Sequence, residues 1–557
     1  MNSVVKPNKI ERLKAELKPA DFLPKIDQLN LNELTEEERF YLKNYGIYNH
    51  KLSPETFMLR LRITAGRIAV SQLREIATIA REYQLKPLIT MRAQIELHGM
   101  DAGNVLTIWH RLERSGITTW QTLTDNFRTI VTDPLDGESS TSLLETYPLI
   151  RKMESLFLKN PDYLGTLPRK FNTAICGNSE SSHSFFSNDL YFALAQKGET
   201  VGFNLYLGGK NSEMAQSVDI FVTEGDLPTL FKAAIKAYKH YGLRGTRSKT
   251  RLYHLLQSVG METFRSYIQS FYPMPLQSAG KLLGKKVKAL EWTTLRNGRK
   301  AFCFRSRFGE ISADDLSCIC DYAEEEKLSI RLGIDQNIHL LGFKTPSTPL
   351  KKYPHLSRLS VCAGSRYCSL SLFDMKEEAE MLPLDRLSRL DVSLGYSGCL
   401  KGCGKHMHTD IGLIGLRTAV YGPTQKSVRL FLGGQYSDGQ AASRLILMAV
   451  PLHSVRDMID VILDEFEQSP YDDFEIFSRN ILNRFSTDFL ALWFLAKYYS
   501  GKAVSLKRIR SGPDTLHSTE EERHIIEHAF SELTLWTREE PPFHKGIQYL
   551  SQKLWRE

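Results

Sequence analysis

The chain has 557 residues, of which 42% are hydrophobic and 24% are charged, and its formal net charge is +8. This length exceeds one simple hydrophobic core and predicts two or three packed domains. The N-terminal segment has no apolar stretch, and the longest apolar segment, residues 489–499, is too short for a bilayer, so we expect a cytoplasmic protein without a secretory signal or membrane contact.

The positive charge is compatible with three kinds of partner. Nucleic acid is one, but no long run of Lys and Arg, zinc-finger spacing or RNA-binding motif accompanies the charge, so we expect no nucleic-acid partner. The other two are a cofactor rich in carboxylates and an acidic electron-donor protein.

Residues 1–54 are charged and amphipathic, and they predict an arm that wraps around the rest of the chain. Beyond the arm, residues 57–100 and 302–343 look like two copies of one unit. Each copy has an apolar strand with two arginines, a turn with a glycine, a helical stretch and a closing strand.

Aligning the first strands from Phe57 and Phe302 pairs Arg60 and Arg62 with Arg305 and Arg307, roughly 245 residues later, and Gly66 pairs with Gly309. Such a repeat predicts gene duplication and a pseudo-two-fold architecture.

A mixed stretch follows each copy, and both stretches contain a strand that ends in Gly-Gly, at residues 201–209 and 428–434. The repeat is therefore expected to include two large lobes. A C-terminal helical extension follows, to which we assign no chemistry, with Trp493, Trp536 and Trp555 as packing residues. The predicted domains are an arm (1–54), half-domains (55–125 and 291–350), lobes (126–290 and 351–480) and the extension (481–557).

Half of the eight cysteines form two close pairs. Cys176 and Cys303 stand alone, and Cys318 and Cys320 are separated by one residue. The pairs lie in segments rich in Gly and Ser, which suits backbone folded tightly around a bound group. By spacing alone, an iron–sulfur cluster, a zinc site and unliganded buried thiols are all possible. The paired cysteines are Cys362 and Cys368, and Cys399 and Cys403.

The C-x₅-C and C-x₃-C pairs, followed by DIGLIG (410–415) and FLGG (431–434), resemble the assimilatory sulfite and nitrite reductase family over roughly residues 40–480. The resemblance implies an α+β fold: duplicated ferredoxin-like β-α-β half-domains and two larger mixed α/β lobes, with pseudo-two-fold symmetry around siroheme and a [4Fe–4S] cluster. It also implies that the four paired cysteines hold the cluster and that Cys403 is shared with the siroheme iron.

The same resemblance supplies residues for binding a small anion. The strand FMLRLRI places one family arginine on Arg62, and DNFRTIVTDP places a second on Arg128. The segment LPRKFN places the substrate lysine on Lys170 and a variable group on Asn172. Convergent cations suit such an anion because they stabilise the charge that develops on it.

Other motif positions imply contacts with siroheme, which carries eight carboxylates. The departures from the family pattern are Ala93 and Glu96 in place of glutamines, Lys401 in place of an asparagine, and a shorter gap between the cysteine pairs. Glu96 would be repelled by carboxylates unless it is protonated or paired with an arginine. The expected cofactor-binding residues are Arg60, Thr90, Arg92, His98, Arg244, Arg247 and Lys401.

The motif Arg169-Lys170-Phe171-Asn172 favours nitrite over sulfite, because sulfite-reducing relatives generally carry a second lysine where this chain has Asn172. The segment CAGSRYC is also similar to the nitrite type. We therefore expect six-electron reduction of nitrite to ammonia, with reduction of sulfite to sulfide as the alternative.

No dinucleotide-binding motif is present, so electrons are expected from another protein, either an acidic ferredoxin or a flavoprotein. Two other functions stay open: a tetrapyrrole-modifying oxygenase of the precorrin type and a non-catalytic siroheme-binding protein.

Overall fold

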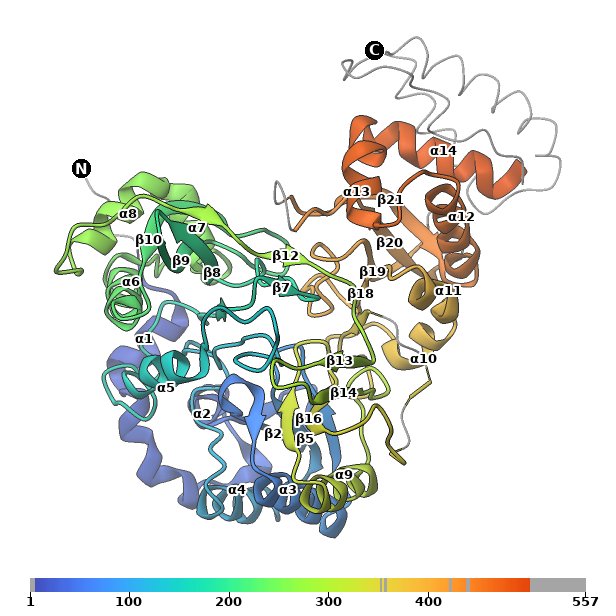
Figure 1. The fold of residues 1–557 in the computed structure, drawn as a ribbon. Coiled ribbons are helices and arrows are strands. Elements are labelled where there is room, and N and C mark those ends of the chain that lie inside the picture. Colours follow the sequence, from blue (N-terminus) through green and yellow to red (C-terminus); the bar gives the residue numbers. More distant parts are fainter. Residues whose placement is uncertain (1–5, 351–352, 355–357, 420–422, 437–440, 501–557) are drawn as a thin grey trace. The chain divides into compact units, whose positions relative to one another are not determined.

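The computed structural model describes residues 6–500 except 351–352, 355–357, 420–422 and 437–440, and the chain forms two compact units, residues 1–354 and 355–557 (Figure 1). Trp536, Trp555 and the extension beyond residue 500 lie outside the described residues. Trp493 is buried, as a packing role requires.

The N-terminal arm is tied to the first unit by its helix α1 (Lys9–Glu16). Asn8 caps this helix, since its side chain accepts from the backbone N–H groups of Ile10 and Glu11. The Asn8 backbone and side-chain nitrogens both donate to the carbonyl of Arg244. A second helix, α2 (Glu36–Leu42), starts with a capping box.

The first half-domain is a four-stranded sheet with strand order β1-β2-β5-β4. Its strands are β1 (Ile47–His50), β2 (Ser53–Leu61), β4 (Lys86–Ile89) and β5 (Ile95–Met100), and its helices are α3 (Val70–Glu82) and α4 (Val105–Arg114).

The second half-domain has strand order β13-β14-β16-β15-β3, in which β3 comes from the first copy. The elements are β3 (Arg67–Ile68), β13 (Trp292–Thr294), β14 (Lys300–Phe304), β15 (Ser329–Leu332), β16 (Ile338–Phe343) and α9 (Ala313–Glu325).

The two copies share one constant offset of 243 residues, which places α3 on α9, β4 on β15 and β5 on β16. Non-glycine residues with positive φ recur at the same offset: Ala65 and Phe308, Gln84 and Lys327, Ala93 and Gln336. The duplication is therefore confirmed.

The strand alignment from Phe57 and Phe302 was wrong by two residues. In the structure Arg62 corresponds to Arg305, but Arg60 corresponds to Cys303. Alternating apolar strands look similar after a shift of two residues, because side-chain direction repeats every second position.

The two copies face each other through reciprocal contacts. Arg67 pairs with Arg331, and the equivalent positions in the other direction, Leu88 and Glu310, also pair. Helices α3 and α9 run side by side (Figure 1) and are joined by ion pairs such as Arg74 to Asp321. An interface in which each copy offers the same surface is the signature of a two-fold relation.

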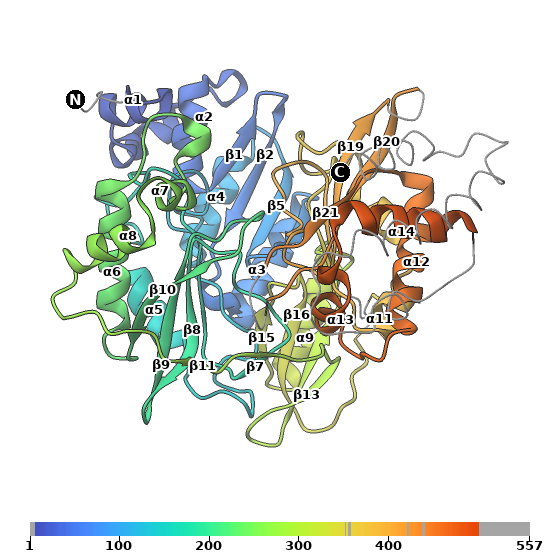
Figure 2. The same cartoon turned by 90° about the horizontal axis from the view of Figure 1, so that it is seen from above.

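The first lobe has a sheet of order β10-β9-β8-β11 (Figure 2). Strand β6 runs parallel to β8. Large side chains such as Phe192, Phe203 and Phe231 join helices and sheet into one core. The strands are β6 (Thr173–Cys176), β7 (Glu180–Ser181), β8 (Leu190–Lys197), β9 (Thr200–Leu207), β10 (Gln216–Val222), β11 (Lys281–Leu282) and β12 (Lys285–Lys286), and the helices are α5 (Tyr147–Ser155), α6 (Leu227–Tyr241), α7 (Leu252–Val259) and α8 (Met261–Gln269).

The second unit repeats this strand pattern, with order β17-β18-β19-β20-β21. Strand β18 runs parallel to β19, as β6 does to β8, and antiparallel strands follow. Its elements are β17 (Leu359–Val361), β18 (Leu394–Ser397), β19 (Ile411–Thr418), β20 (Gln425–Leu432), β21 (Arg444–Pro451), α10 (Met375–Glu380), α11 (Leu384–Arg389), α12 (Val455–Glu467), α13 (Phe474–Asn480) and α14 (Thr487–Ser500).

Both Gly-Gly turns follow the equivalent strand, and Gly208 and Gly433 each have φ of +87°. A Cβ on Gly209 would lie 2.2 Å from the carbonyl oxygen of Phe186, so only glycine fits there. The α+β duplicated fold is as the sequence predicted.

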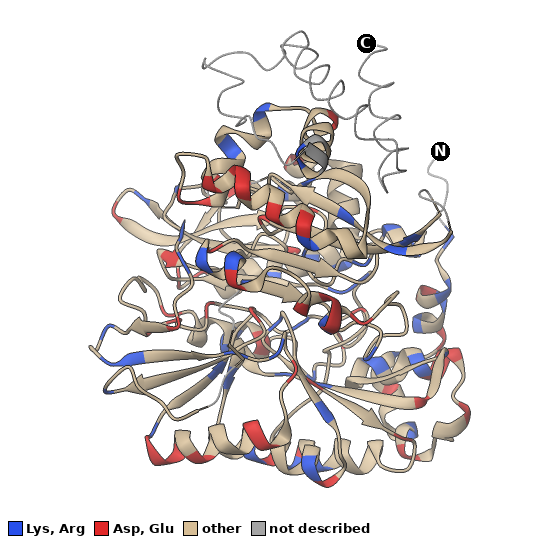
Figure 3. Ribbon diagram, turned by 90° about the vertical axis from the view of Figure 1, so that its right-hand side faces the viewer, with Lys and Arg blue, Asp and Glu red and all other residues tan. Residues whose placement is uncertain are grey.

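None of the helices in the described ranges combines the length and apolar character that a bilayer crossing needs. Basic and acidic residues are interspersed along the described elements (Figure 3), so the net charge of +8 does not arise from one basic helix or strand.

Candidate functional site

Two of the sequence motifs lie side by side at the start of the first lobe. The Arg128 N–H donates to the carbonyl of Phe171 at 2.9 Å, and the Phe171 N–H donates to Asn126 at 3.0 Å. This pairing places Arg128 beside the segment that carries Lys170 and Asn172. Asn172 is buried, and its N–H donates to an Asp189 carboxylate oxygen at 2.8 Å.

A third motif joins them through a tight turn between β4 and β5. The Thr90 hydroxyl accepts from the N–H groups of Arg92 and Gln94, and Ala93 has φ of +51°. The Arg92 guanidinium then donates to the carbonyl of Thr129 at 2.7 Å and to Asn188 at 3.2 Å. Thr90 therefore shapes the turn, and Arg92 reaches into the lobe.

Glu96 is paired with an arginine, one of the two possibilities that the sequence left. Arg60 lies opposite Glu96 in the β2–β5 pair and donates to it from Nε at 2.8 Å. His98 lies 2.9 Å from the other carboxylate oxygen. Burial alone would raise the pKa of Glu96, but Arg60 and His98 hold it at about 2.

A second buried carboxylate, Asp125, holds three cations. Arg247 donates to both of its oxygens at 2.7 Å, Lys14 of the arm lies at 2.8 Å and Arg169 at 3.4 Å. Burial alone would raise the pKa of Asp125, but these cations lower it to about 2.

Arg244 has a different set of partners. It pairs with Glu11 of the arm and donates to the carbonyls of Thr166 and Lys239. These partners are protein groups, and the contacts fasten the arm to the first lobe.

A third carboxylate, Asp189, lies directly before β8 and accepts from Arg251 at 2.8 and 2.9 Å. Sequence reasoning missed Asp125, Asp189 and Arg251. Asp125 stands within the quoted motif DNFR, so a search for carboxylates near the expected arginines could have found it. Asp189 and Arg251 carry no local signal.

These contacts define an arginine cluster that holds more positive than negative charge. Its hydrogen-bonded carboxylates are Glu96, Asp125 and Asp189. Side chains at its margin keep 23 to 33% of their surface exposed. The cluster consists of Arg60, Arg92, Arg128, Arg169, Arg247 and Arg251.

The positive charges of the arginines in this cluster repel one another. Burial, followed by repulsion from Arg60 and other arginines, lowers the pKa of Arg92 to about 9 and that of Arg128 well below its usual range. The Nε atoms of Arg92 and Arg128 are buried and have no hydrogen-bond partner. Since arginine stays charged at neutral pH, this arrangement favours an added anion or a group with carboxylates.

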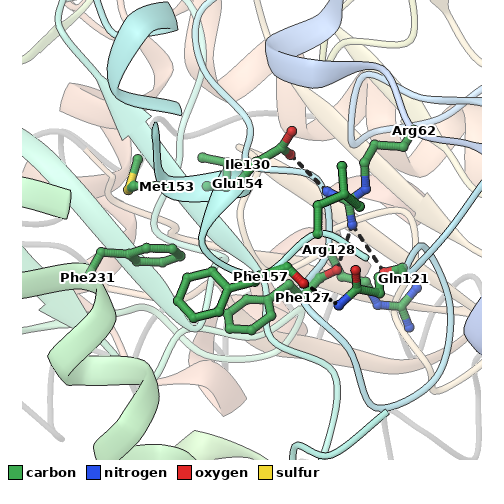
Figure 4. A pocket seen from close by; sticks show the side chains of 10 residues that line it. Arg62, Gln121, Phe127, Arg128, Ile130, Met153, Glu154, Phe157 and Phe231 are labelled. Carbon is green, nitrogen blue, oxygen red and sulfur yellow. Dashed lines mark hydrogen bonds and ion pairs between the residues drawn. The ribbon is translucent and has the colours of Figure 1, made fainter. Parts of the chain in front are cut away.

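Arg62, expected among the anion-binding residues, is committed to protein groups instead. It pairs with Glu154 at 2.8 Å and donates to three backbone carbonyls, including that of Phe127 at 2.8 Å. Figure 4 shows it with Arg128 at a small pocket whose lining is mostly apolar.

The second unit brings the two cysteine pairs together. The Gly398 N–H donates to the Cys362 sulfur at 3.1 Å, and the Leu372 N–H donates to the carbonyl of Gly398. Burial and then the nearby Cys403 thiol raise the pKa of Cys362 to about 11. A bound metal would reverse this effect, since metal ligands are thiolates.

The cysteine loops do not close tightly enough for a single ion. In the described parts of the chain, only Cys303, Asp335 and His339 form a group whose ligand atoms all lie within 4.8 Å of one another. No three of Cys362, Cys368, Cys399 and Cys403, which all lie in the described ranges, form such a group. Lys401 is exposed in the loop between the last two cysteines.

Two family models match segments of the first unit. A family model described as "Nitrite and sulphite reductase 4Fe-4S domain" matches residues 123–274. Another, described as "Nitrite/Sulfite reductase ferredoxin-like half domain", matches residues 50–115.

Two similar relatives carry the name ferredoxin–nitrite reductase. That of Leptolyngbya laminosa is 26% identical over 498 residues, covering 83% of this chain and 98% of its own. That of Synechococcus elongatus is 27% identical over 501 residues, covering 83% and 96%. A "Sulfite reductase [ferredoxin] 2" of Mycolicibacterium paratuberculosis is 28% identical, covering 66% and 71%.

The solved structure of the Mycobacterium tuberculosis NirA protein aligns with a TM-score of 0.78 at 23% identity. The alignment covers 87% of this chain and 97% of that one, and it shows that the two share a fold.

Proposed function

Because this chain belongs to the nitrite and sulfite reductase family, we propose that it catalyses the six-electron reduction of nitrite to ammonia. It is an oxidoreductase, with siroheme and a [4Fe–4S] cluster as its cofactors. Siroheme iron supplies the site at which the anion is reduced, and the cluster supplies electrons.

The observation that carries the proposal is the arginine cluster of the first unit. Its surplus of positive charge and the unpartnered Nε atoms of Arg92 and Arg128 fit a macrocycle rich in carboxylates and a small anionic substrate. A carboxylate at either Nε would satisfy a buried donor and offset repulsion among the arginines.

Two residues are proposed for substrate binding in this cluster. Arg128 would hold the anion and stabilise negative charge as N–O bonds break, and Lys170 would supply a compact charge and protons. Arg62, through Glu154 and the carbonyl of Phe127, would fix the segment that carries Arg128.

The siroheme carboxylates would be bound by Arg92 and by the exposed side of Arg60. Thr90 would act by shaping the turn, and His98 by fixing Glu96. Arg247 would help to orient the arginine cluster by its ion pair with Asp125, while Arg244 would hold the arm by its ion pair with Glu11.

The [4Fe–4S] cluster would be held by the four paired cysteines of the second unit. Cys403 would be shared with the siroheme iron, as family membership implies. This assignment is tested by replacing Cys399 with serine and counting iron and acid-labile sulfide. We expect cluster loss, whereas the same change at the exposed Cys318 should leave both counts unchanged. Retention of the full cluster in the Cys399→Ser variant would contradict the assignment.

Nitrite is preferred over sulfite because Asn172, not a lysine, stands beside Lys170. A neutral side chain suits a monoanion, whereas a second lysine would suit a dianion. Reduction of sulfite to sulfide by the same residues is the second candidate, supported by the sulfite reductase among the relatives.

A ferredoxin is the proposed electron donor, because the nitrite reductases that this chain resembles are named for it. A flavoprotein donor is the alternative. The net charge of +8 would speed encounter with an acidic donor, and that rate should fall as salt is added. A cytoplasmic location is part of the same proposal.

The deciding experiment measures kcat/KM for nitrite and for sulfite with reduced methyl viologen and with reduced ferredoxin, using protein loaded with both cofactors. A higher value for nitrite is expected. Turnover of neither anion by fully loaded protein would favour a siroheme-binding protein without catalysis.

A further inference from the structure

The duplication places a second set of polar residues at the positions that the arginine cluster uses in the first copy. At the offset of 243 residues, Arg60 corresponds to Cys303 and Glu96 to His339. Within the first copy, Arg60 lies directly opposite Glu96 in the β2–β5 pair, and within the second copy Cys303 lies directly opposite His339 in the β14–β16 pair. Arg92, in the turn before β5, corresponds to Asp335, in the turn before β16.

This second set has ligand atoms of three kinds close together. The Cys303 sulfur, an Asp335 carboxylate oxygen and a His339 ring nitrogen all lie within 4.8 Å of one another. Cys303 and His339 are 6% and 8% exposed. His339 Nε2 lies 3.2 Å from one Asp335 oxygen and 3.3 Å from the other.

The surrounding backbone fixes the orientation of Asp335. Asn337 donates to its carboxylate from the backbone N–H at 3.3 Å and from its side chain at 3.1 Å. Asn337 is itself held by the Ser306 N–H at 3.1 Å. Partners of this kind orient metal ligands in known sites.

Gly333 provides the room in which these groups meet. A Cβ at this position would lie 1.9 Å from an Asp335 oxygen and 2.8 Å from His339 Nε2. Any other residue would displace the two side chains, so the packing depends on glycine.

A fourth candidate ligand atom, a nitrogen of His183, comes from the first lobe. His183 Nε2 lies 3.9 Å from Asp335, and its Nδ1 lies 3.8 Å from Asp133, which also accepts from the Ser181 hydroxyl at 2.5 Å. His183 therefore lies beside Asp335, within reach of an ion that this carboxylate would bind.

We propose that Cys303, Asp335 and His339 bind one Zn²⁺ ion, with His183 as the fourth ligand. Sulfur, imidazole and carboxylate are the ligands that zinc takes in tetrahedral sites, with Zn–S of about 2.3 Å and Zn–N of about 2.0 Å. Small side-chain movements would give those distances for Cys303, Asp335 and His339, which are already grouped, and His183 would have to move toward them from its place beside Asp335. The ion would fasten the second half-domain to the first lobe.

The proposal is independent of the reductase assignment, because it uses none of the cysteines proposed for the [4Fe–4S] cluster. The test is zinc content together with zinc X-ray absorption of the holoenzyme, and with iron and acid-labile sulfide counted in the same sample. We expect about one zinc per chain, with one sulfur neighbour and the rest nitrogen or oxygen.

Variants separate this ion from zinc bound elsewhere. Cys303→Ser and His339→Ala should lose the zinc and keep the iron, whereas Cys318→Ser should keep both. Zinc with four sulfur neighbours, or with none, would overturn the proposal, since the first is zinc in the cluster site and the second is adventitious.

If the variants fail to fold, the zinc X-ray absorption spectrum of the wild-type protein still tests the proposal. Wild-type protein without zinc is then titrated with Zn²⁺ against a chromophoric chelator. No binding of an equivalent ion in that titration would also overturn the proposal. Loss of iron together with zinc in Cys303→Ser would show that the two sites are not separate and would equally count against it.

Discussion

Arg62 and Arg305 occupy equivalent positions in the two half-domains, and each is 6% exposed and ion-paired with a carboxylate, Arg62 with Glu154 of the first lobe and Arg305 with Glu291, next to β13 of the second half-domain. The arginine that the two copies share is therefore buried and ion-paired in both. The position that differs, Arg60 in one and Cys303 in the other, is where the copies differ in chemistry.

The different partners of Arg62 and Arg128 predict different losses of stability when each is replaced by alanine. Arg62→Ala leaves the Glu154 carboxylate buried without its cation and should lower the free energy of unfolding by about 3 to 5 kcal/mol. Arg128→Ala removes the side-chain hydrogen bond to the carbonyl of Thr124 and relieves repulsion among the arginines, so stability should change by about 1 kcal/mol or less.

Activity should rank the same two variants in the reverse order, with the larger loss in Arg128→Ala. The kcat/KM for nitrite should fall by about 100-fold in Arg128→Ala, as expected when a group that stabilises developing charge is removed. Denaturant unfolding and steady-state kinetics check both variants. A stable Arg62→Ala protein that has lost turnover would instead place Arg62 at the substrate.

Asp125→Asn should loosen the arm as well as the arginine cluster. The substitution keeps the shape but removes the charge that Lys14, Arg169 and Arg247 share, so we expect a loss of about 3 kcal/mol. Helix α1 should also become more susceptible to limited proteolysis.

The matched control for Asp125→Asn is Asp27→Asn, which removes an exposed partner of His110 and should cost about 0.5 kcal/mol or less. Equal effects of the two substitutions would argue against a special role for Asp125.

Glu96→Gln should destabilise the protein in a pH-dependent way. The pKa of Glu96 falls from its ordinary 4.5 to about 2, a difference equivalent to about 3 kcal/mol. Because the folded state lowers this pKa, the contribution is complete above pH 4.5 and is lost as the pH falls toward 2.

Unfolding midpoints of wild type and Glu96→Gln should therefore differ most at neutral pH and approach each other below pH 4.5. The exposed Glu199→Gln serves as the control and should show no such convergence. A gap that is constant with pH would show that packing, not charge, is responsible.

Asn172→Lys should shift the specificity ratio toward sulfite by about tenfold, or 1.4 kcal/mol, because it adds a cation beside Lys170. The measurement is the ratio of kcat/KM for sulfite to that for nitrite. Asn172→Gln, which adds length without charge, should leave the ratio near that of wild type. An unchanged ratio in the lysine variant would remove the basis for the nitrite preference.

The sequence was sufficient for features that depend on local order. Cysteine spacing, the Gly-Gly turns and the repeated β-α-β pattern are periodic or short-range, so the duplicated α+β fold and the family could be inferred before any coordinates. The pairing of Glu96 with an arginine was also within reach, because a buried carboxylate needs a cation.

The sequence by itself therefore determined the architecture, the cysteine pairs and the kind of anion chemistry, since these are written in spacing and residue type. Only the tertiary structure decided which arginines remain available to bind an anion. Arg62 and Arg244 are taken up by Glu154 and Glu11, whereas Arg92 and Arg128 keep unpartnered Nε atoms. A side chain's partners come from distant segments, and the charge that they leave uncompensated exists only after those segments have packed together.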